Sequence, residues 1–212
     1  MESVRMSLCS SEKSGNVRVF SNGNVQEWGG NDKFGIVRTL DPIPSETDSY
    51  YFQVEINHSG DDHCNIHIGL TSKDLSRHTK TIENWSNKTF SGFTNVFHSF
   101  GYSSSGTVYG EKTTHNSRKH SYSWEDTIGC HVDNINGICC FSKNGIYLPK
   151  LFHLTDMGEQ LFPTIAFGLT VTEANIETLI LEKPFQFDMQ GMQCRLSYEK
   201  HFFHSYAKQC WG

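Results

Sequence analysis

Histidine is the side chain best suited to chemistry in this sequence, which contains 11 of them. His58, His63 and His67 fall within one short stretch, and His201 and His204 are three residues apart. A catalytic zinc ion needs three protein ligands and one open position. The spacing does not bring three such ligands together, and histidines scattered over a protein surface are common. We therefore expect no metal site and no cofactor.

Cysteine is the second candidate for chemistry. Cys139 and Cys140 are adjacent in a run with strand character, so one side chain should enter the core and the other should point outward. A nucleophilic cysteine needs a histidine base and a lowered pKa, and the sequence offers no pattern for either. The odd count and the lack of a Cys-x-x-Cys pair instead predict seven free thiols: Cys9, Cys64, Cys130, Cys139, Cys140, Cys194 and Cys210.

Acidic residues could support a hydrolytic site, which would need two carboxylates facing each other across a groove. Asp61 and Asp62 are paired in a turn, but neighbouring residues on an extended chain face opposite ways. Solvated turn residues are the simpler interpretation, so we expect no enzymatic activity. A carbohydrate-binding or hydrolytic β-sandwich is nevertheless kept as the alternative to a binding module.

Charge and hydropathy limit the classes of partner. The 18 basic and 23 acidic residues give a formal net charge of −5, and they are scattered. The nearest thing to a basic stripe, Arg118-Lys119-His120, is too short to follow a nucleic-acid backbone. Residues 1–20 contain no signal-like apolar run, and no run is long enough to span a bilayer. We expect a protein of the cytoplasm, or of the nucleus, with reduced thiols and no membrane partner.

Hydrophobic periodicity predicts short strands separated by turns. Residues 50–56 are the clearest case, with Tyr50, Phe52, Val54 and Ile56 at period two on one face. Residues 65–70 alternate in the same way. Asn144-Gly145 lies between two short apolar runs and predicts a hairpin with a type I′ turn. Further strands are expected at 17–20, 25–28, 34–39, 127–132, 138–142, 146–148, 161–168 and 174–181.

This pattern predicts one domain with a polar segment at each end. We interpret residues 1–15 as a flexible N-terminal tail, 16–190 as an all-β domain and 191–212 as a C-terminal extension. Residues 71–98 are polar with isolated aromatic residues, which is typical of a long loop. Trp85 and Phe93 in that loop, and Tyr102 after it, could anchor loops to the core or could face a partner.

The order of these segments resembles the SPRY domain, and most closely the SPRY domains of Ran-binding-protein scaffolds. Seven segments carry the resemblance, and none of them is specific by itself. They are Tyr50–Ile56, Ile68-Gly69-Leu70, Phe100-Gly101-Tyr102, Ile128-Gly129-Cys130 with Asp133, Phe141–Gly145, Leu161-Phe162-Pro163 and Pro184–Asp188. Ser103-Ser104-Ser105 and Asn175-Ile176-Glu177 depart from the family pattern, so peptide specificity does not carry over.

The resemblance implies a bent, concanavalin-like sandwich of two antiparallel sheets, monomeric as an isolated domain. It also implies recognition of a peptide or folded protein through one rim of loops, as an adaptor in a scaffold or as the substrate-recognition part of a ubiquitin ligase. On this basis the predicted partner-binding residues are Asn31, Asp32, Lys33, Asp62, Trp85, Phe93, Tyr102, Leu169, Thr170 and Val171.

Overall fold

Fourteen β-strands form the regular structure in the described part of the chain. The computed structural model describes residues 8–13, 17–20, 24–27, 35–57, 66–72, 99–109, 114–116, 120–154, 160–167 and 175–179. The chain divides into two units, Met1–Glu182 and Lys183–Gly212, and every described residue belongs to the first. The expected domain end at residue 190 therefore falls inside the second unit.

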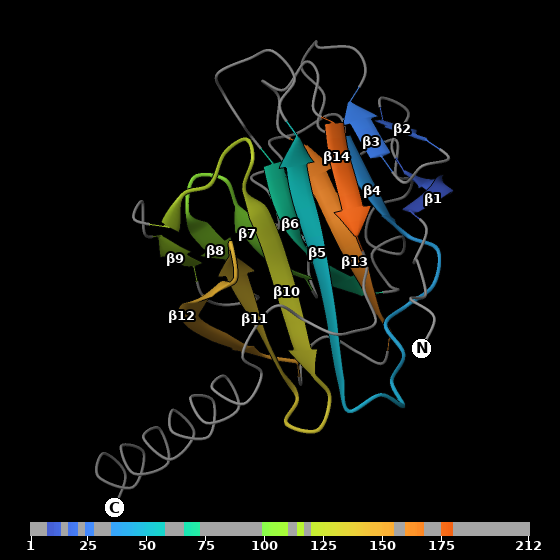
Figure 1. Cartoon of the computed structure of the whole chain (residues 1–212). Helices are drawn as coiled ribbons and strands as arrows, with labels where there is room; N and C mark the ends of the chain where they lie inside the picture. The colour runs from blue at the N-terminus through green and yellow to red at the C-terminus, as the bar shows by residue number, and fades with distance from the viewer. Residues whose placement is uncertain are drawn as a thin grey trace, which may run out of the picture. The chain divides into compact units, whose positions relative to one another are not determined.

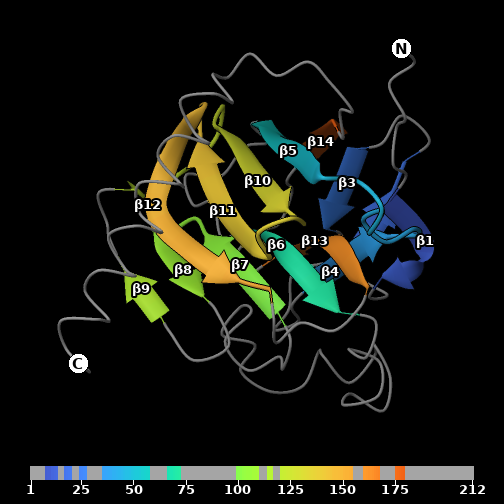
Figure 2. The same ribbon diagram turned by 90° about the horizontal axis from the view of Figure 1, so that it is seen from below.

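The strands form two sheets of seven, and every pairing between them is antiparallel (Figure 1). Sheet A has the order β1 (Leu8–Lys13), β4 (Gly35–Thr39), β13 (Leu161–Phe167), β6 (Ile66–Ser72), β7 (Ser99–Ser103), β8 (Thr107–Tyr109), β9 (Thr114–Asn116). Sheet B has the order β12 (Ile146–His153), β11 (Ile138–Lys143), β10 (Thr127–Asp133), β5 (Ser49–Asn57), β14 (Asn175–Leu179), β3 (Asn24–Glu27), β2 (Val17–Val19). Figure 2 shows the sheets as two layers, so the expected sandwich is confirmed.

The core lies between the two sheets and follows the predicted alternation. Phe52, Val54 and Ile56 of β5 are at most 1% exposed and belong to this core. Aromatic rings cross from one sheet to the other, since the ring of Phe100 on β7 lies 5.2 Å from that of Phe152 on β12. Burying one side chain of this size contributes about 1.5–3 kcal/mol, so such contacts hold the layers together.

Cys139 and Cys140 point to opposite faces of β11, as the sequence predicts. Cys139 belongs to the core as expected, but Cys140, on the opposite face of β11, is only 2% exposed. The alternation along the strand was predicted correctly. Cys140 therefore points outward as predicted, and period-two reasoning does not show that the outer face of the sheet is covered at this position.

Besides β7, three strands lie where the sequence predicts none. Residues 8–13 fall in the expected flexible tail but form β1, which pairs with β4 through Leu8 and Thr39. Strands β8 and β9 occupy positions 107–109 and 114–116, in a polar part of the chain. All three are at or near the β1 and β9 edges of sheet A. A strand in such a position is held largely by backbone hydrogen bonds, which leave little trace in side-chain hydrophobicity.

The predicted hairpin between β11 and β12 is confirmed. Asn144 and Gly145 have φ values of +47° and +80°, the two positive angles of a type I′ turn. The flanking residues Lys143 and Ile146 are cross-strand partners, so the connection is a two-residue loop.

Two glycines within the segments that resemble the SPRY pattern are required by close packing. A Cβ atom on Gly69 would lie 1.9 Å from the carbonyl oxygen of Phe100 on the neighbouring strand. A Cβ atom on Gly129 would lie 2.2 Å from the hydroxyl oxygen of Tyr51. Any larger residue at these positions would force the strands or the tyrosine to move.

Candidate binding rim

Sheet register brings several strand ends together at one end of the sandwich. Gly35 and Ile66 both pair with Phe167 in sheet A. Asn57 pairs with Asn175 in sheet B. The connections 28–34, 58–65 and 168–174 begin or end at these residues, and each joins a strand of one sheet to a strand of the other. Their attachment points therefore lie side by side although they are far apart in sequence.

Seven of the predicted partner-binding residues belong to these three connections. They lie outside the described residues, so their assignment stays a prediction: Asn31, Asp32, Lys33, Asp62, Leu169, Thr170 and Val171. What supports it is the meeting of their attachment points, which local sequence patterns could not indicate. The carboxylate pair Asp61-Asp62, considered for hydrolysis, lies outside the described residues as well.

Trp85 and Phe93 belong to a segment with different attachment points. Residues 73–98 connect β6 to β7, and they leave and re-enter sheet A where Thr71 pairs with Ser99. Ser72 at the same strand end pairs with Leu161, the residue of β13 farthest from Phe167. The segment is therefore attached at the end of sheet A opposite Gly35, Ile66 and Phe167. Trp85 and Phe93 lie outside the described residues, and their part in the rim stays a prediction.

Tyr102 is not a surface residue, and its assignment to the rim was wrong. Its side chain is 0% exposed, and its ring lies 4.8 Å from that of Tyr122 and 5.8 Å from that of Phe141. Its hydroxyl donates a hydrogen bond to the carbonyl oxygen of His120, and burial raises its pKa. Of the two interpretations offered for this aromatic residue, anchoring to the core is the one that the structure supports.

A short irregular segment, residues 120–126, crosses the same end of the sandwich, and we call it the strap. The amide of Glu125 donates to the carbonyl of Ile56 at 2.7 Å, and the amide of Ile56 donates to the carbonyl of Asp126 at 3.1 Å. The strap is thus fixed beside Asn57, where one of the rim connections begins. The sequence patterns predict no regular element over these residues.

Tyr122 anchors the strap to sheet A. Its hydroxyl is buried 2.7 Å from the carbonyl oxygen of Ile66 and 2.9 Å from that of Tyr102. Its amide donates to the carbonyl of Ser104 at 3.0 Å. A buried tyrosine hydroxyl normally has such a partner. An aromatic residue at every second position of a polar stretch, Tyr122 and then Trp124, was the signal that could have revealed this anchor.

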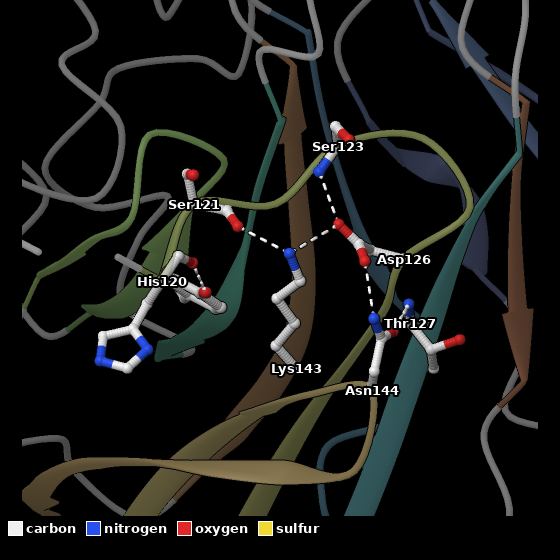
Figure 3. Close-up of polar contacts among 8 residues, drawn as sticks. His120, Ser121, Ser123, Asp126, Thr127, Lys143 and Asn144 are labelled. Carbon is white, nitrogen blue, oxygen red and sulfur yellow. Dashed lines mark hydrogen bonds and ion pairs between the residues drawn. The ribbon is translucent and has the colours of Figure 1, made fainter. Parts of the chain in front are cut away.

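Asp126 joins the strap to the hairpin of β11 and β12 (Figure 3). Its carboxylate accepts hydrogen bonds from the Ser123 amide at 2.8 Å and the Asn144 side chain at 2.7 Å, and it lies 3.0 Å from the Lys143 ammonium. Burial alone would raise the pKa of Asp126, but these three groups outweigh burial and lower it. Lys143 also donates to the carbonyl of Ser121 at 2.7 Å. The charge of Asp126 is therefore balanced within the protein.

Two buried histidines lie on the outer faces of the sheets. His67 of β6 stacks on Tyr109, with ring centroids 6.0 Å apart, and burial lowers its pKa to about 4. Burial also lowers the pKa of His131 on β10 to about 4, partly opposed by Asp133. Within the described ranges no three potential ligands are grouped as a metal site. His58, His63, His201 and His204 lie outside those ranges.

The thiol of Cys130 is a poor nucleophile. Cys130, Cys139 and Cys140 are buried and free. Burial raises the pKa of Cys130 well above its usual value, and proximity to the other two thiols acts in the same direction. A thiol with a raised pKa holds little of the reactive thiolate.

Among the residues that the structure describes, no helix has the length and apolarity needed to cross a membrane.

Comparison with known proteins identifies the family of this chain. The model of the SPRY domain matches residues 49–181, which is more than half of the chain. The chain belongs to the SPRY domain family. SPRY domains are protein-interaction modules, so a role in protein binding follows for this chain in general terms.

Curated relatives are Ran-binding proteins. The chain is 30% identical to the Ran-binding proteins 9/10 homolog of Drosophila melanogaster over 152 residues, which are 72% of this chain and 14% of that protein. It is 31% identical to Ran-binding protein 10 of Danio rerio over 154 residues, which are 73% of this chain and 23% of that protein. This SPRY chain thus spans less than a quarter of the length of either relative.

Solved structures share the fold at low sequence identity. The SPRY domain of human HERC1 has a TM-score of 0.59 and 15% identity, covering 84% of this chain and 99% of that one. A second human SPRY domain has a TM-score of 0.56 and 17% identity, covering 80% of this chain and 98% of that one. The two-sheet architecture is therefore that of the family.

Proposed function

We propose that this SPRY chain is a non-catalytic recognition module. It binds a peptide segment or a folded protein through the rim connections 28–34, 58–65 and 168–174. The observation that carries the proposal is the meeting of their attachment points, where Gly35 and Ile66 flank Phe167 and Asn57 pairs with Asn175. Loops held by a rigid β-scaffold are a frequent recognition surface, because they vary without disturbing the core.

The proposal extends to the setting in which the module works. We propose that it acts as a monomeric adaptor inside the cell, in the cytoplasm or nucleus, within a scaffold or ubiquitin-ligase assembly. Support comes from the match to the SPRY domain, which is a protein-interaction module. The three free thiols among the described cysteines suit a reducing compartment.

A capture experiment with paired surface variants tests the rim. The full chain is immobilised, and the proteins that it retains from cell extract are identified by mass spectrometry. Crosslinking then locates the contact, and titration of the purified partner measures the affinity. Leu169→Asp places a charge in the connection after β13. Ile135→Asp is the matched control, because Ile135 is 72% exposed in the turn between β10 and β11. This turn follows Asp133, at one end of β10. Thr127, at the other end of β10, pairs with Glu55 close to Asn57, so the turn lies at the end of sheet B away from the rim connections.

The two variants should differ in binding but not in folding. We expect Leu169→Asp to weaken the binding free energy of the partner by at least about 2 kcal/mol, the usual threshold of an interface hot spot. Ile135→Asp should bind like the wild type, and both should melt at the wild-type temperature. Wild-type affinity of Leu169→Asp for the partner would contradict the assignment of the rim as the binding surface. Turnover of a small substrate that disappears on changing one polar residue would contradict the non-catalytic role.

A carbohydrate-binding or hydrolytic sandwich remains the alternative. A glycan array probed with the full chain, beside the protein capture, separates the two functions. Retention of a glycan without any retained protein would favour this alternative.

A further inference from the structure

The turn between β11 and β12 contains a residue pair, Asn144-Gly145, that can react with water. In an Asn-Gly sequence the backbone nitrogen of the glycine attacks the side-chain Cγ of the asparagine. The Cγ–Nδ2 bond breaks, and ammonia leaves with the proton of the glycine amide. Water then opens the resulting succinimide ring to aspartate or isoaspartate. Glycine favours the attack because it has no side chain to hinder it, and Asn144 is exposed to solvent.

Hydrogen bonds hold both ends of the Asn144 side chain. Its carbonyl oxygen accepts a bond from the Thr127 amide at 2.8 Å, and its amide nitrogen donates to the Asp126 carboxylate at 2.7 Å. The backbone amide of Asn144 also donates to the carbonyl of Thr127 at 2.8 Å. Figure 3 shows Asn144 between these two residues. Ring closure moves the side chain towards Gly145, so its bond to Asp126 has to open first.

Deamidation changes the Asn144 side chain from a hydrogen-bond donor into an anion. The nitrogen that donates to Asp126 is replaced by a carboxylate oxygen, which is ionised at neutral pH. Two like charges in contact repel each other, and the Lys143 ammonium is already shared between Asp126 and the carbonyl of Ser121. In isoaspartate the backbone gains one carbon, which a two-residue turn with positive φ values does not accommodate.

Asp126 transmits this change to the strap. Its carboxylate accepts the Ser123 amide at 2.8 Å, and its carbonyl accepts the Ile56 amide at 3.1 Å. A shift of Asp126 away from a second carboxylate therefore strains the bonds that fix the strap beside Asn57, where one of the rim connections begins. One chemical change in the hairpin thus acts on a different part of the molecule.

The pair Asn136-Gly137 offers a control within the same chain. Asn136 is exposed, and Gly137 has a φ of +61° in the turn between β10 and β11. The Asn136 side chain donates at 2.6 Å to the carboxylate of Asp133, three residues earlier in the chain. This turn lies at the end of β10 away from Thr127 and the strap. Deamidation of Asn136 should therefore leave the strap unchanged.

We propose that Asn144 is a deamidation site that acts as a slow switch. Its conversion to aspartate or isoaspartate releases the strap from the hairpin and weakens binding at the neighbouring rim. The chemistry needs only water, and opening of the bond between Asn144 and Asp126 sets its rate. The effect on binding rests on the proposed protein-binding function, whereas the release of the strap does not.

The reaction rate tests the role of the Asp126 bond. The full chain is incubated at mildly alkaline pH, and peptide mapping by mass spectrometry follows asparagine, aspartate and isoaspartate at Asn144 and Asn136. Asp126→Ala removes the hydrogen-bond acceptor and should speed deamidation of Asn144 about tenfold, the factor expected for a lost bond to a charged group. Asp41→Ala, which removes an exposed carboxylate between β4 and β5, should react like the wild type. Asn136 should react equally in all three proteins.

Variants that imitate the product test the release of the strap. Hydrogen exchange of the Ile56 and Glu125 amides should be faster in Asn144→Asp than in the wild type, because both amides bond between strap and β5. Asn136→Asp should exchange there like the wild type. The double variant Asp126→Asn/Asn144→Asp restores one carboxylate and one carboxamide in contact, and it should regain protection.

Titration of the partner that the wild type captures tests the link to binding. Asn144→Asp should weaken it about fivefold or more, the lower range of coupling between two sites. The double variant should recover affinity, and Asn136→Asp should bind like the wild type.

Contrary results would overturn the proposal. It fails if Asn144 stays intact in the folded chain while Asn136 reacts, if Asp126→Ala reacts no faster, or if Asn144→Asp exchanges and binds like the wild type. If Leu169→Asp weakens the partner and Asn144→Asp does not, this inference fails and the proposed function stands. If Leu169→Asp binds like the wild type, the rim assignment itself fails, whatever the strap does.

Discussion

The interior between the sheets and the strap at their end are held by opposite kinds of interaction. Inside, Tyr102 and Phe141 pack ring against ring with no exposure, and only the tyrosine hydroxyl uses a polar contact. In the strap, a carboxylate, an ammonium and an amide hold an irregular backbone in contact with solvent. The apolar interior determines stability, whereas the polar strap determines which side chains face outward. Substitutions in these two regions should therefore have different consequences.

The largest effect is expected inside. Tyr102→Ala should reduce the free energy of unfolding by about 3–5 kcal/mol, because it leaves a cavity among aromatic rings. Tyr102→Phe should cost only about 0.5–1.5 kcal/mol, for the lost hydrogen bond to His120. Urea unfolding measures both. A partner-binding residue on the surface would instead leave the fold intact when truncated. An Ala variant as stable as the wild type would contradict the buried position.

The second-largest effect is expected from acid, which should lower the free energy of unfolding through two buried histidines on the outer faces of the sheets. His67 and His131 have pKa values of about 4 in the folded protein, against 6.5 for an ordinary histidine. Between these pH values the unfolded chain binds more protons, so stability is full above pH 6.5 and falls as the pH drops towards 4. The loss approaches about 3 kcal/mol for each histidine.

The test compares the pH dependence of unfolding in the wild type and in single variants. The free energy of unfolding is measured in urea between about pH 7.5 and about pH 4.5. His131→Leu should flatten this dependence by its own share, whatever its stability at neutral pH. An equally steep dependence in the variant would show that His131 is not held neutral by burial.

An intermediate effect is expected at the hairpin that supports the strap. Gly145→Val should lower the free energy of unfolding by about 1–3 kcal/mol, because a β-branched residue resists a φ of +80°. Ile146→Val, next to it and exposed, should stay within about 0.5 kcal/mol. Equal unfolding midpoints for the two variants would show that the turn tolerates a side chain.

No covalent restraint is expected in either region. All seven cysteines should be free, because their number is odd and Cys130, Cys139 and Cys140 carry free thiols. Alkylation of the denatured chain without reductant, followed by intact-mass measurement, should add seven groups. A pair that reacts only after reduction would disprove this.

The sequence alone predicted the strands with alternating side chains and the hairpin. Period-two patterns such as that of Tyr50–Ile56 are local, and so is the positive φ demanded by Asn144-Gly145, so both can be recognised without a fold. The family resemblance rested on the same local segments. Strands that a partner strand holds through its backbone, such as β1, leave no such local signal.

Only the tertiary structure decided which of these residues are accessible and which lie together. In the sequence Tyr102 resembles an aromatic residue of a loop, yet in the structure it packs against Phe141 of β11 and Tyr122 of the strap. Asp126 and Lys143 are distant in sequence but meet at 3.0 Å. Burial and charge balance depend on contacts between segments far apart in the chain, and local patterns carry no information about those contacts.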